Sequence, residues 1–115
     1  MKILITGDRG FLGTETKKVL EAHGHSWIGY DLMDGYDIRD MAQFQAVVSA
    51  TNPNAILHLA AIARFADADK DPQLAWESNV LGTMNVARVA GMFHKTLVYA
   101  STGSVYMPLD EKQPI

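Results

Sequence analysis

The sequence has no cysteine, no long apolar run and no excess of positive charge. Without cysteine, the chain can form neither a disulfide framework nor a thiolate metal site. No apolar run approaches membrane-spanning length, and the chain starts in an apolar strand without a basic leader, so we expect a cytoplasmic protein. Ten basic residues stand against 13 acidic ones, which argues against nucleic acid or an anionic membrane as a partner.

The composition is that of a soluble globular protein, with 48% hydrophobic and 20% charged residues, and the 115 residues fit one domain. Short apolar segments alternate with segments of helical periodicity. Strands are predicted at 3–5, 25–30, 55–61 and 95–100, and helices at 11–23, 41–50 and 72–93. This alternation predicts an α/β fold with a doubly wound parallel sheet.

A glycine-rich turn follows the first predicted strand. Gly7, Gly10 and Gly13 recur at every third position, and a helix is predicted from Phe11 onward. Backbone N–H groups at a helix start, together with the helix dipole, favour a negatively charged ligand. In such turns the first glycine permits the tight turn, the second lets a pyrophosphate approach, and the third lets the helix pack against the strand. The turn predicts dinucleotide binding; the alternative is a strand-to-helix turn of another α/β protein.

Asp31 ends the second predicted strand, 18 positions after Gly13. An acid at about this interval accepts hydrogen bonds from both hydroxyls of an adenosine ribose. The alternative interpretation is a solvated acid at a strand end. A carboxylate here disfavours a 2′-phosphate and so indicates NAD. Arg9 in the glycine turn leaves NADP open, since a guanidinium can meet an extra phosphate.

The segment 32–40 is short for a full third strand with its preceding helix. Asp40 and Gln43 resemble a capping box that starts the helix at 41–50. The connection between the second and third predicted strands is therefore compressed.

Residues 62–71 are predicted to form a loop. Asp71 followed by Pro72 then starts the helix at 72–93, as an N-cap acid and a first-turn proline. This helix is apolar nearly all round, so one side is expected on the sheet. The other side needs a partner, either later chain or a second subunit, and we expect that a homodimer could form through 72–93.

His58 is the polar exception in the apolar strand 55–61, and we interpret it as a satisfied core histidine rather than a catalytic one. Ligands of parallel sheets bind at the carboxyl ends of the strands. Four stretches of this chain lie at such ends: Thr6-Gly7, Asp31, Ala60-Ala61 and Ser101-Thr102. They are expected to converge on one cleft.

In this order, the four stretches resemble the N-terminal half of an extended short-chain dehydrogenase/reductase. More narrowly, they resemble the NAD(P)-dependent epimerase/dehydratase family that acts on nucleotide sugars. The resemblance rests on Thr6-Gly7-x-x-Gly10-Phe11-Leu12-Gly13, Asp37-Ile38-Arg39-Asp40, His58-Leu59-Ala60-Ala61, Asn79-Val80-Leu81-Gly82-Thr83 and the stretch 99–106. It implies a Rossmann-like fold and an NAD cofactor, with these cofactor-binding residues: Gly7, Gly10, Phe11, Leu12, Gly13, Asp31, Asp37, Ile38, Leu59, Ala60, Ala61 and Asn79.

The same resemblance implies a catalytic hydroxyl at Thr102, with Ser101 as its neighbour. That hydroxyl would hydrogen-bond the substrate group that gains or loses a hydride. The family's general base is the tyrosine of a Tyr-x-x-x-Lys motif, and none of the four tyrosines here has a lysine at that spacing. In relatives, a stretch like Glu111 to Pro114 shortly precedes that motif.

We therefore interpret residues 1–115 as the NAD(P)-binding Rossmann domain of a longer enzyme. The sheet would stop after about the fifth strand position, and the C-terminal substrate part would be absent. We expect no turnover from this chain alone. The alternative is a non-enzymatic NAD(P)-binding module such as a redox sensor, although Ser101 and Thr102 favour an enzyme. The sequence names neither the sugar nor the reaction among epimerisation, dehydration and reduction.

Overall fold

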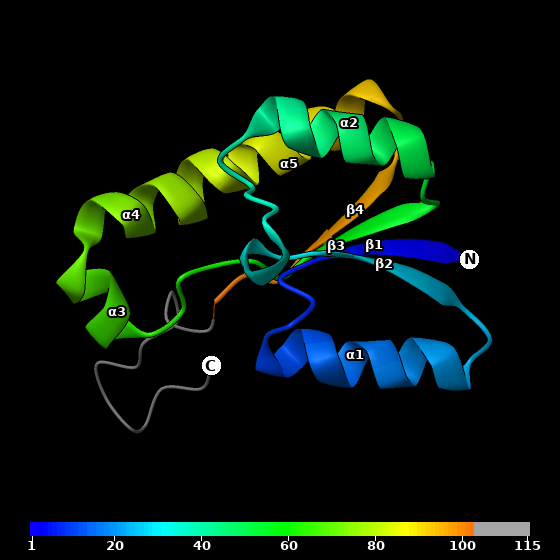
Figure 1. Ribbon diagram of the computed structural model, residues 1–115, viewed down its shortest axis with the longest axis horizontal. Helices are drawn as coiled ribbons and strands as arrows, with labels where there is room; N and C mark the ends of the chain where they lie inside the picture. Colours follow the sequence, from blue (N-terminus) through cyan, green and yellow to red (C-terminus); the bar gives the residue numbers. More distant parts are fainter. Residues whose placement is uncertain (103–115) are drawn as a thin grey trace, which may run out of the picture.

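The computed structural model describes residues 1–102 as a parallel sheet of four strands with helices on both faces (Figure 1). The strand order is β2-β1-β3-β4, so the chain crosses from one side of β1 to the other after β2. The elements are β1 (Lys2–Thr6), α1 (Phe11–Ala22), β2 (Ser26–Tyr30), the 3₁₀ turn η1 (Leu32–Asp34), α2 (Met41–Thr51), β3 (Ala55–His58), α3 (Phe65–Lys70), α4 (Pro72–Trp76), the π-helical turn η2 (Glu77–Leu81), α5 (Gly82–Met92) and β4 (Thr96–Tyr99).

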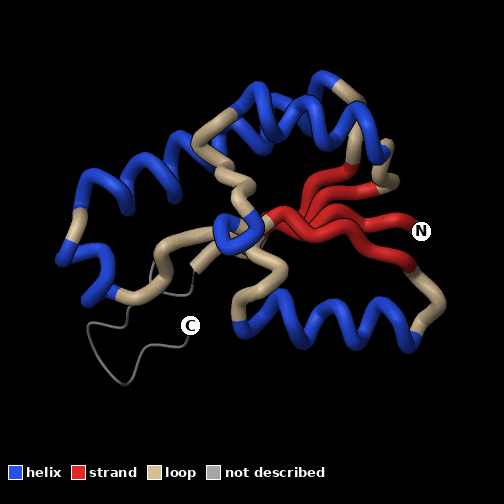
Figure 2. Tube along the Cα trace, in the orientation of Figure 1, coloured by secondary structure: helices blue, strands red, loops and turns tan. Residues whose placement is uncertain are grey.

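The helices divide between the two faces as a doubly wound sheet requires. Helix α1 lies on one face, and α2 and α5 lie side by side on the other (Figure 1; Figure 2 shows the strands as one bundle between them). The predicted α/β class, the parallel sheet and its winding are therefore confirmed.

The main core fills the space between the sheet and the α2–α5 layer. Alternate residues of a strand face opposite sides, and the residues facing this layer are among the most buried of the described chain. The core includes Leu4, Tyr30, Phe44, Val48, Ile56, Val86 and Val89. These side chains come from three strands and two helices, so the layer holds the carboxyl ends of β1, β2 and β3 in fixed relation.

The opposite face is covered only in part. Leu57 and Val98 are register partners on β3 and β4. Their neighbours Ile56 and Leu97 pack into the core on the other face, so both point toward the face that carries α1. Helix α1 packs against β2, and Val98 stays 54% exposed. This face is therefore open beside β4 in the described part of the chain.

Several local predictions are confirmed. Asp40 accepts a hydrogen bond from Gln43 N–H at 3.0 Å, and Asp71 accepts one from Leu74 N–H at 3.0 Å, so both caps form. The segment after β2 holds only a 3₁₀ turn and no strand, as its length requires.

Other local predictions are wrong. The predicted loop 62–71 contains α3, whose Asp67 and Lys70 lie in the first and last turns, where their charges complement the helix dipole. β3 ends at His58 and not at Ala61. The 72–93 segment is helical, but the π-helical turn widens its middle.

Within the residues that the structure describes, no helix is long and apolar enough to cross a membrane. The predicted motif residues beyond Thr102, among them Glu111 and Pro114, lie outside the described residues.

Candidate functional site

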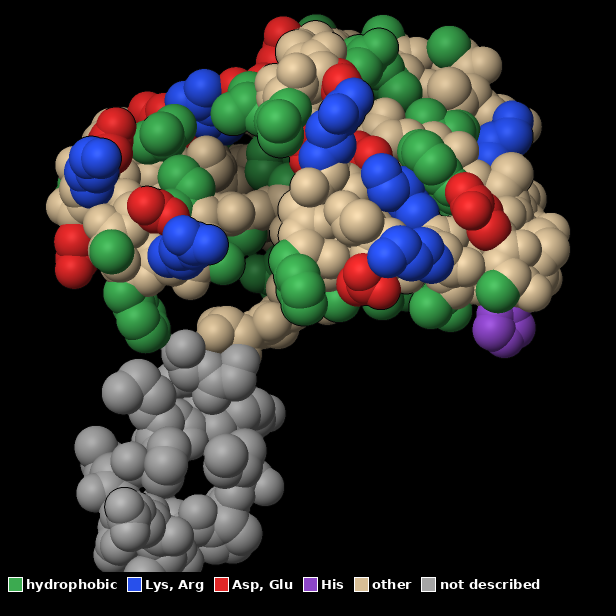
Figure 3. Space-filling view, turned by 60° about the horizontal axis from the view of Figure 1, so that its bottom comes forward, with side chains coloured by type: hydrophobic (Ala, Val, Ile, Leu, Met, Phe, Trp, Pro, Cys, Tyr) green, Lys and Arg blue, Asp and Glu red, His purple; other side chains and the backbone are tan. Residues whose placement is uncertain are grey.

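A cleft of about 260 Å³ opens at the carboxyl ends of β1, β2 and β3. In the space-filling view the molecule is hollowed between its left part and its main body, with hydrophobic side chains around the hollow (Figure 3). Most of the predicted cofactor residues line the cleft: Gly7, Gly10, Asp31, Asp37, Ile38, Leu59, Ala60 and Ala61. The structure thus brings together stretches that are up to 54 residues apart, such as Thr6 and Ala60.

Two glycines make the approach of β1, α1 and β3 possible. Gly7 has φ +73°, and a Cβ on it would lie 2.8 Å from the backbone nitrogen of Ala60. A Cβ on Gly13 would lie 2.6 Å from Cα of Asp8. Both distances are far shorter than van der Waals contact, so a side chain at either position would push the helix or the strand end away.

The N-terminus of α1 has the properties of an anion site. Gly10 is its N-cap residue and provides no side-chain cap, and the first turn holds no acidic residue. The N–H groups of a first helical turn have no partner within their helix, and in the described part of the chain no side chain caps this one. Phe11 and Leu12 are 90% and 54% exposed. Their side chains are apolar and cannot bind a phosphate, so the backbone N–H groups of this turn would be the donors.

Asp31 is held at the edge of the cleft by backbone donors. Its Oδ2 accepts a hydrogen bond from the N–H of Arg9 at 3.0 Å, and its Oδ1 accepts one from the N–H of Met33 at 2.9 Å. A carboxylate has about four lone-pair sites, so two acceptor positions remain for ribose hydroxyls. Together with the uncapped helix, this carboxylate fits the donors and acceptors that a dinucleotide presents.

A buried polar network fixes the strand ends beneath the cleft. Thr6 Oγ1 accepts hydrogen bonds from the N–H groups of Leu59 and Ala60, both at 3.1 Å, and lies 2.6 Å from Nδ1 of His58. Both acceptor positions of the hydroxyl are used, so its proton goes to Nδ1. Nε2 of His58 must then carry the ring proton and donate it to Thr83 Oγ1 at 2.9 Å.

Burial lowers the pKa of His58 to about 4, so the ring is neutral at pH 7. It also stacks on Tyr99, with ring centroids 5.6 Å apart. The interpretation of His58 as a satisfied core histidine is confirmed. Its function is to join β1, β3 and α5.

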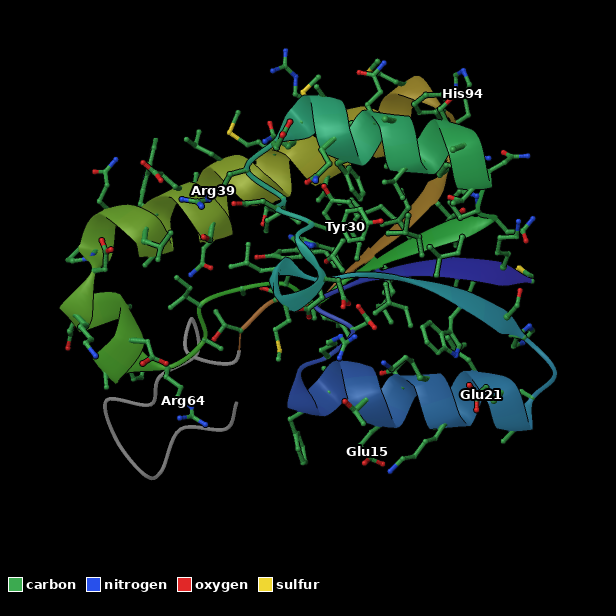
Figure 4. All side chains as sticks on the ribbon, viewed as in Figure 1. Glu15, Glu21, Tyr30, Arg39, Arg64 and His94 are labelled. Carbon is green, nitrogen blue, oxygen red and sulfur yellow. The ribbon has the colours of Figure 1, made fainter. Side chains whose placement is uncertain are left out.

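Arg39 spans the far wall of the cleft and was missed by the sequence reasoning. Its guanidinium donates to Asp37 at 2.7 Å and to Glu77 at 3.1 Å, which ties the segment after β2 to the π-helical turn (Figure 4). The hydrogen bond from Arg39 is the main cause that lowers the pKa of Asp37. The pairing of Arg39 with Asp37 could have been predicted, because the two residues are close together in the Asp37-Ile38-Arg39-Asp40 stretch. The pairing with Glu77 could not, because Glu77 is 38 residues away.

Other lining residues were also not predicted. They are Tyr30, Leu32, Tyr36, Ile62, Leu74 and Ser78. Ile38 lines the cleft and is also part of the buried core, where it packs against Gly82.

The other predicted site residues lie outside the lining of the cleft: Phe11, Leu12, Gly13, Asn79, Ser101 and Thr102. Asn79 accepts a hydrogen bond from Ile62 N–H at 2.7 Å and donates to Ile62 O at 3.0 Å, so it fixes the loop after β3. Ser101 and Thr102 are exposed just beyond β4. Ala100 N–H donates to His58 O at 3.2 Å, which anchors the start of this segment. The catalytic role of Thr102 stays a prediction.

The model of the NAD dependent epimerase/dehydratase family matches residues 3–115. A UDP-glucose 4-epimerase of Rhizobium meliloti is 32% identical over 130 residues, covering 95% of this chain and 39% of the relative. The chain therefore spans about two fifths of the length of that relative.

Two solved structures show the same fold. The UDP-glucose 4-epimerase of Thermus thermophilus in complex with NAD has a TM-score of 0.90 and 27% identity, over 100% of this chain and 42% of that one. A dTDP-4-dehydrorhamnose reductase of Bacillus anthracis in complex with NADP has a TM-score of 0.77 and 32% identity, over 85% of this chain and 35% of that one.

Proposed function

Since this chain belongs to the NAD dependent epimerase/dehydratase family, we propose that it is the NAD-binding part of an enzyme that acts on a nucleotide sugar. One observation carries the proposal: the uncapped start of α1 and the carboxylate of Asp31 flank the same cleft. The first suits a pyrophosphate and the second a ribose, which are neighbouring groups of a dinucleotide.

The remaining residues of the cleft would each contact a different group of the cofactor. The apolar walls formed by Leu59, Ala60 and Ile62 suit flat rings. Asp37 lines the cleft as well, and its carboxylate is held there by hydrogen bonds from the backbone N–H and the guanidinium of Arg39. Asn79 would act indirectly: its side chain holds the backbone of Ile62, which lines the cleft. A bound nicotinamide supplies the hydride acceptor or donor for the reaction.

Thr102 is proposed to contact the substrate, with Ser101 beside it. A hydroxyl donates and accepts, so it can bind either an alcohol or a carbonyl. No Tyr-x-x-x-Lys motif occurs in the 115 residues. Loss of a positioned base costs about 10²–10⁴-fold in rate, and missing substrate contacts cost more. We therefore propose that these residues alone have no measurable turnover.

The cofactor proposal is tested by titrating the folded chain with NADH and following nicotinamide fluorescence. We expect saturable binding to one site per chain. A sample that is folded by circular dichroism and binds neither NADH nor NADPH would defeat the proposal. A matched variant is Gly10→Val, which places a side chain in the lining of the cleft and is expected to lose NADH.

The activity proposal needs a separate assay with UDP-glucose and other nucleotide sugars. No epimerase, dehydratase or reductase turnover is expected from residues 1–115. A longer chain that includes a Tyr-x-x-x-Lys motif should show turnover. Turnover by the 115 residues would show that the tyrosine is not needed. NADH binding without turnover by any extended chain would favour the non-enzymatic module instead.

We also propose that the outer face of the 72–92 helical segment contacts a second copy of the chain. Four large apolar side chains there are 37% to 53% exposed: Trp76, Val80, Leu81 and Met84. Exposed apolar patches of this kind mark interaction surfaces. Sedimentation that gives a monomer across a wide concentration range would contradict this.

A further inference from the structure

A second hollow adjoins Asp31, and its lining includes Arg9, Lys17, Asp8 and Asp34. Asp31 links it to the cleft. Its carboxylate lines the cleft, and it also accepts hydrogen bonds from the N–H groups of Arg9 and Met33, two residues of the hollow. A group attached to a ribose at Asp31 would therefore face this hollow.

Both cations of the hollow are already paired with carboxylates of the chain. Arg9 donates through Nε to one oxygen of Asp34 at 2.8 Å and through a terminal nitrogen to the other at 2.6 Å. Lys17 donates to Asp8 at 3.0 Å. The Arg9–Asp34 contact is bidentate, which is the same fork that a guanidinium uses for a phosphate. Asp34 thus occupies the donors that a phosphate would need.

The short connection after β2 places Asp34 there. Asp31 caps the turn η1 by accepting from Met33 N–H, and Asp34 N–H donates to the carbonyl of Asp31 at 3.0 Å. Asp34 is therefore held one turn beyond Asp31, on the side of Arg9.

We propose that Asp34 sets the preference of this site for NAD over NADP by occupying the guanidinium of Arg9. The inference rests on the proposed function. A phosphate monoester carries about −1.5 to −2 charges at pH 7. Beside Asp31 it would face the carboxylates of Asp31 and Asp34, while the nearest fork of donors is already used. A ribose hydroxyl needs no such fork.

The Arg9–Asp34 ion pair contributes little to the stability of the fold. The Arg9 and Asp34 side chains are 51% and 36% exposed, and exposed pairs contribute little to stability. Removing the carboxylate should leave the fold unchanged and the guanidinium available. The fold itself accommodates either cofactor, since the two similar structures are described with NAD and with NADP.

The test compares the NADH and NADPH affinities of the chain and of Asp34→Asn, by fluorescence titration and by the shift in melting temperature. We expect Asp34→Asn to raise the ratio of NADPH to NADH affinity by about tenfold, since it removes both a competing ion pair and a repulsion. Asp34→Glu keeps the charge and should restore the original ratio. Adding Arg9→Met to Asp34→Asn should abolish the gain.

Glu15→Gln is the matched control, because it removes one negative charge from the outer side of α1 (Figure 4). It should leave the ratio unchanged. If Asp34→Asn binds NADH but leaves the ratio unchanged, or if Glu15→Gln changes it equally, the inference is overturned while the proposed function stands. If the folded chain binds neither cofactor, the proposed function fails, and this inference fails with it.

Discussion

The glycine turn after β1 and the strand β4 belong to one sheet but are packed in opposite ways. Near the turn, polar side chains are buried: Thr6, Asp8 and His58 are at most 3% exposed. On β4, Val98 and Tyr99 are 54% and 52% exposed. Buried polar groups need specific partners, and the turn finds nearly all of them within this chain. The exposed apolar side chains of β4 indicate a surface that packs against another segment or another molecule.

This difference separates two parts of the proposed function, cofactor binding and substrate contact. The donors and acceptors that we propose for a dinucleotide are held by contacts among residues 2–85, such as Thr6 to His58 and His58 to Thr83. The proposed substrate contact at Thr102 lies at the open side. We infer that cofactor binding by these 115 residues can be tested separately from substrate turnover.

The largest expected effect concerns Gly13→Ala. A Cβ there would meet the backbone of Asp8 at 2.6 Å, and the strand end cannot yield without breaking the network beneath it. We expect a loss of about 3 kcal/mol or more in the free energy of unfolding, measured with urea. Gly91→Ala is the matched control, since nothing lies within 4 Å of its Cβ. It should be neutral or stabilising by up to about 1 kcal/mol, and equal losses for both would show that the turn is not tightly packed.

Lys17→Met removes the partner of a nearly buried acid. The side chains of Lys17 and Asp8 are 19% and 5% exposed, with Lys17 also 4.6 Å from the Trp27 ring centroid. Lys17 donates to Asp8 Oδ2, and Asp8 Oδ1 has no hydrogen-bond partner among the described residues. The substitution would therefore leave the carboxylate without its cation. Removing one partner of a fully buried pair costs about 3–5 kcal/mol, and we expect a loss near the lower end because Lys17 is 19% exposed. Lys18→Met breaks only an exposed pair with Glu15 and should cost less than about 0.5 kcal/mol; similar costs would mean that Asp8 is solvated.

The pH dependence of stability tests the network beneath the cleft. His58 has a pKa of about 4 in the folded chain against an ordinary value of 6.5, so the unfolded chain binds the additional proton as the pH falls from 6.5 toward 4. Stability from this group is complete above pH 6.5 and is lost as the pH falls. Between pH 7 and 5 the loss should be about 2 kcal/mol. Urea unfolding of the chain and of His58→Asn should differ in this slope, and an unchanged slope would contradict a neutral, buried ring.

The smallest effect on stability is expected on the outer face of the 72–92 helical segment. Met84 is 51% exposed on α5, so Met84→Glu should change the free energy of unfolding by less than about 0.5 kcal/mol. It should weaken self-association in sedimentation, because it places a charge on the proposed contact face. Val19→Glu makes the same kind of change on α1, where Val19 is 58% exposed, and should leave self-association unchanged. If both variants change self-association equally, the outer face of the 72–92 segment is not a specific contact surface.

The sequence predicted the parts of the structure that depend on local patterns. Alternating apolar and helical segments, the caps at Asp40 and Asp71, and the core role of His58 all follow from neighbouring residues. The π-helical turn and α3 did not, because their residues have mixed propensities that tertiary packing decides.

Side-chain pairing was the least predictable feature. Arg9 pairs with Asp34 across 25 positions, and Arg39 with Glu77 across 38. Nothing in the spacing of these residues specifies such contacts, which depend on how the compressed 32–40 segment folds back. Arg9 was interpreted from sequence as a group that could meet a phosphate, whereas the structure pairs it with a carboxylate.

Amide hydrogen exchange of the 115-residue chain, measured with and without NADH, tests the contrast between the two sides most directly. We predict strong protection of β1 and β3 and weak protection of β4 without ligand. NADH should add protection at residues 7–13, 31–39 and 59–62 and leave β4 unchanged. Added protection centred on β4, or none at the glycine turn in a folded sample, would contradict a complete cofactor site in this chain.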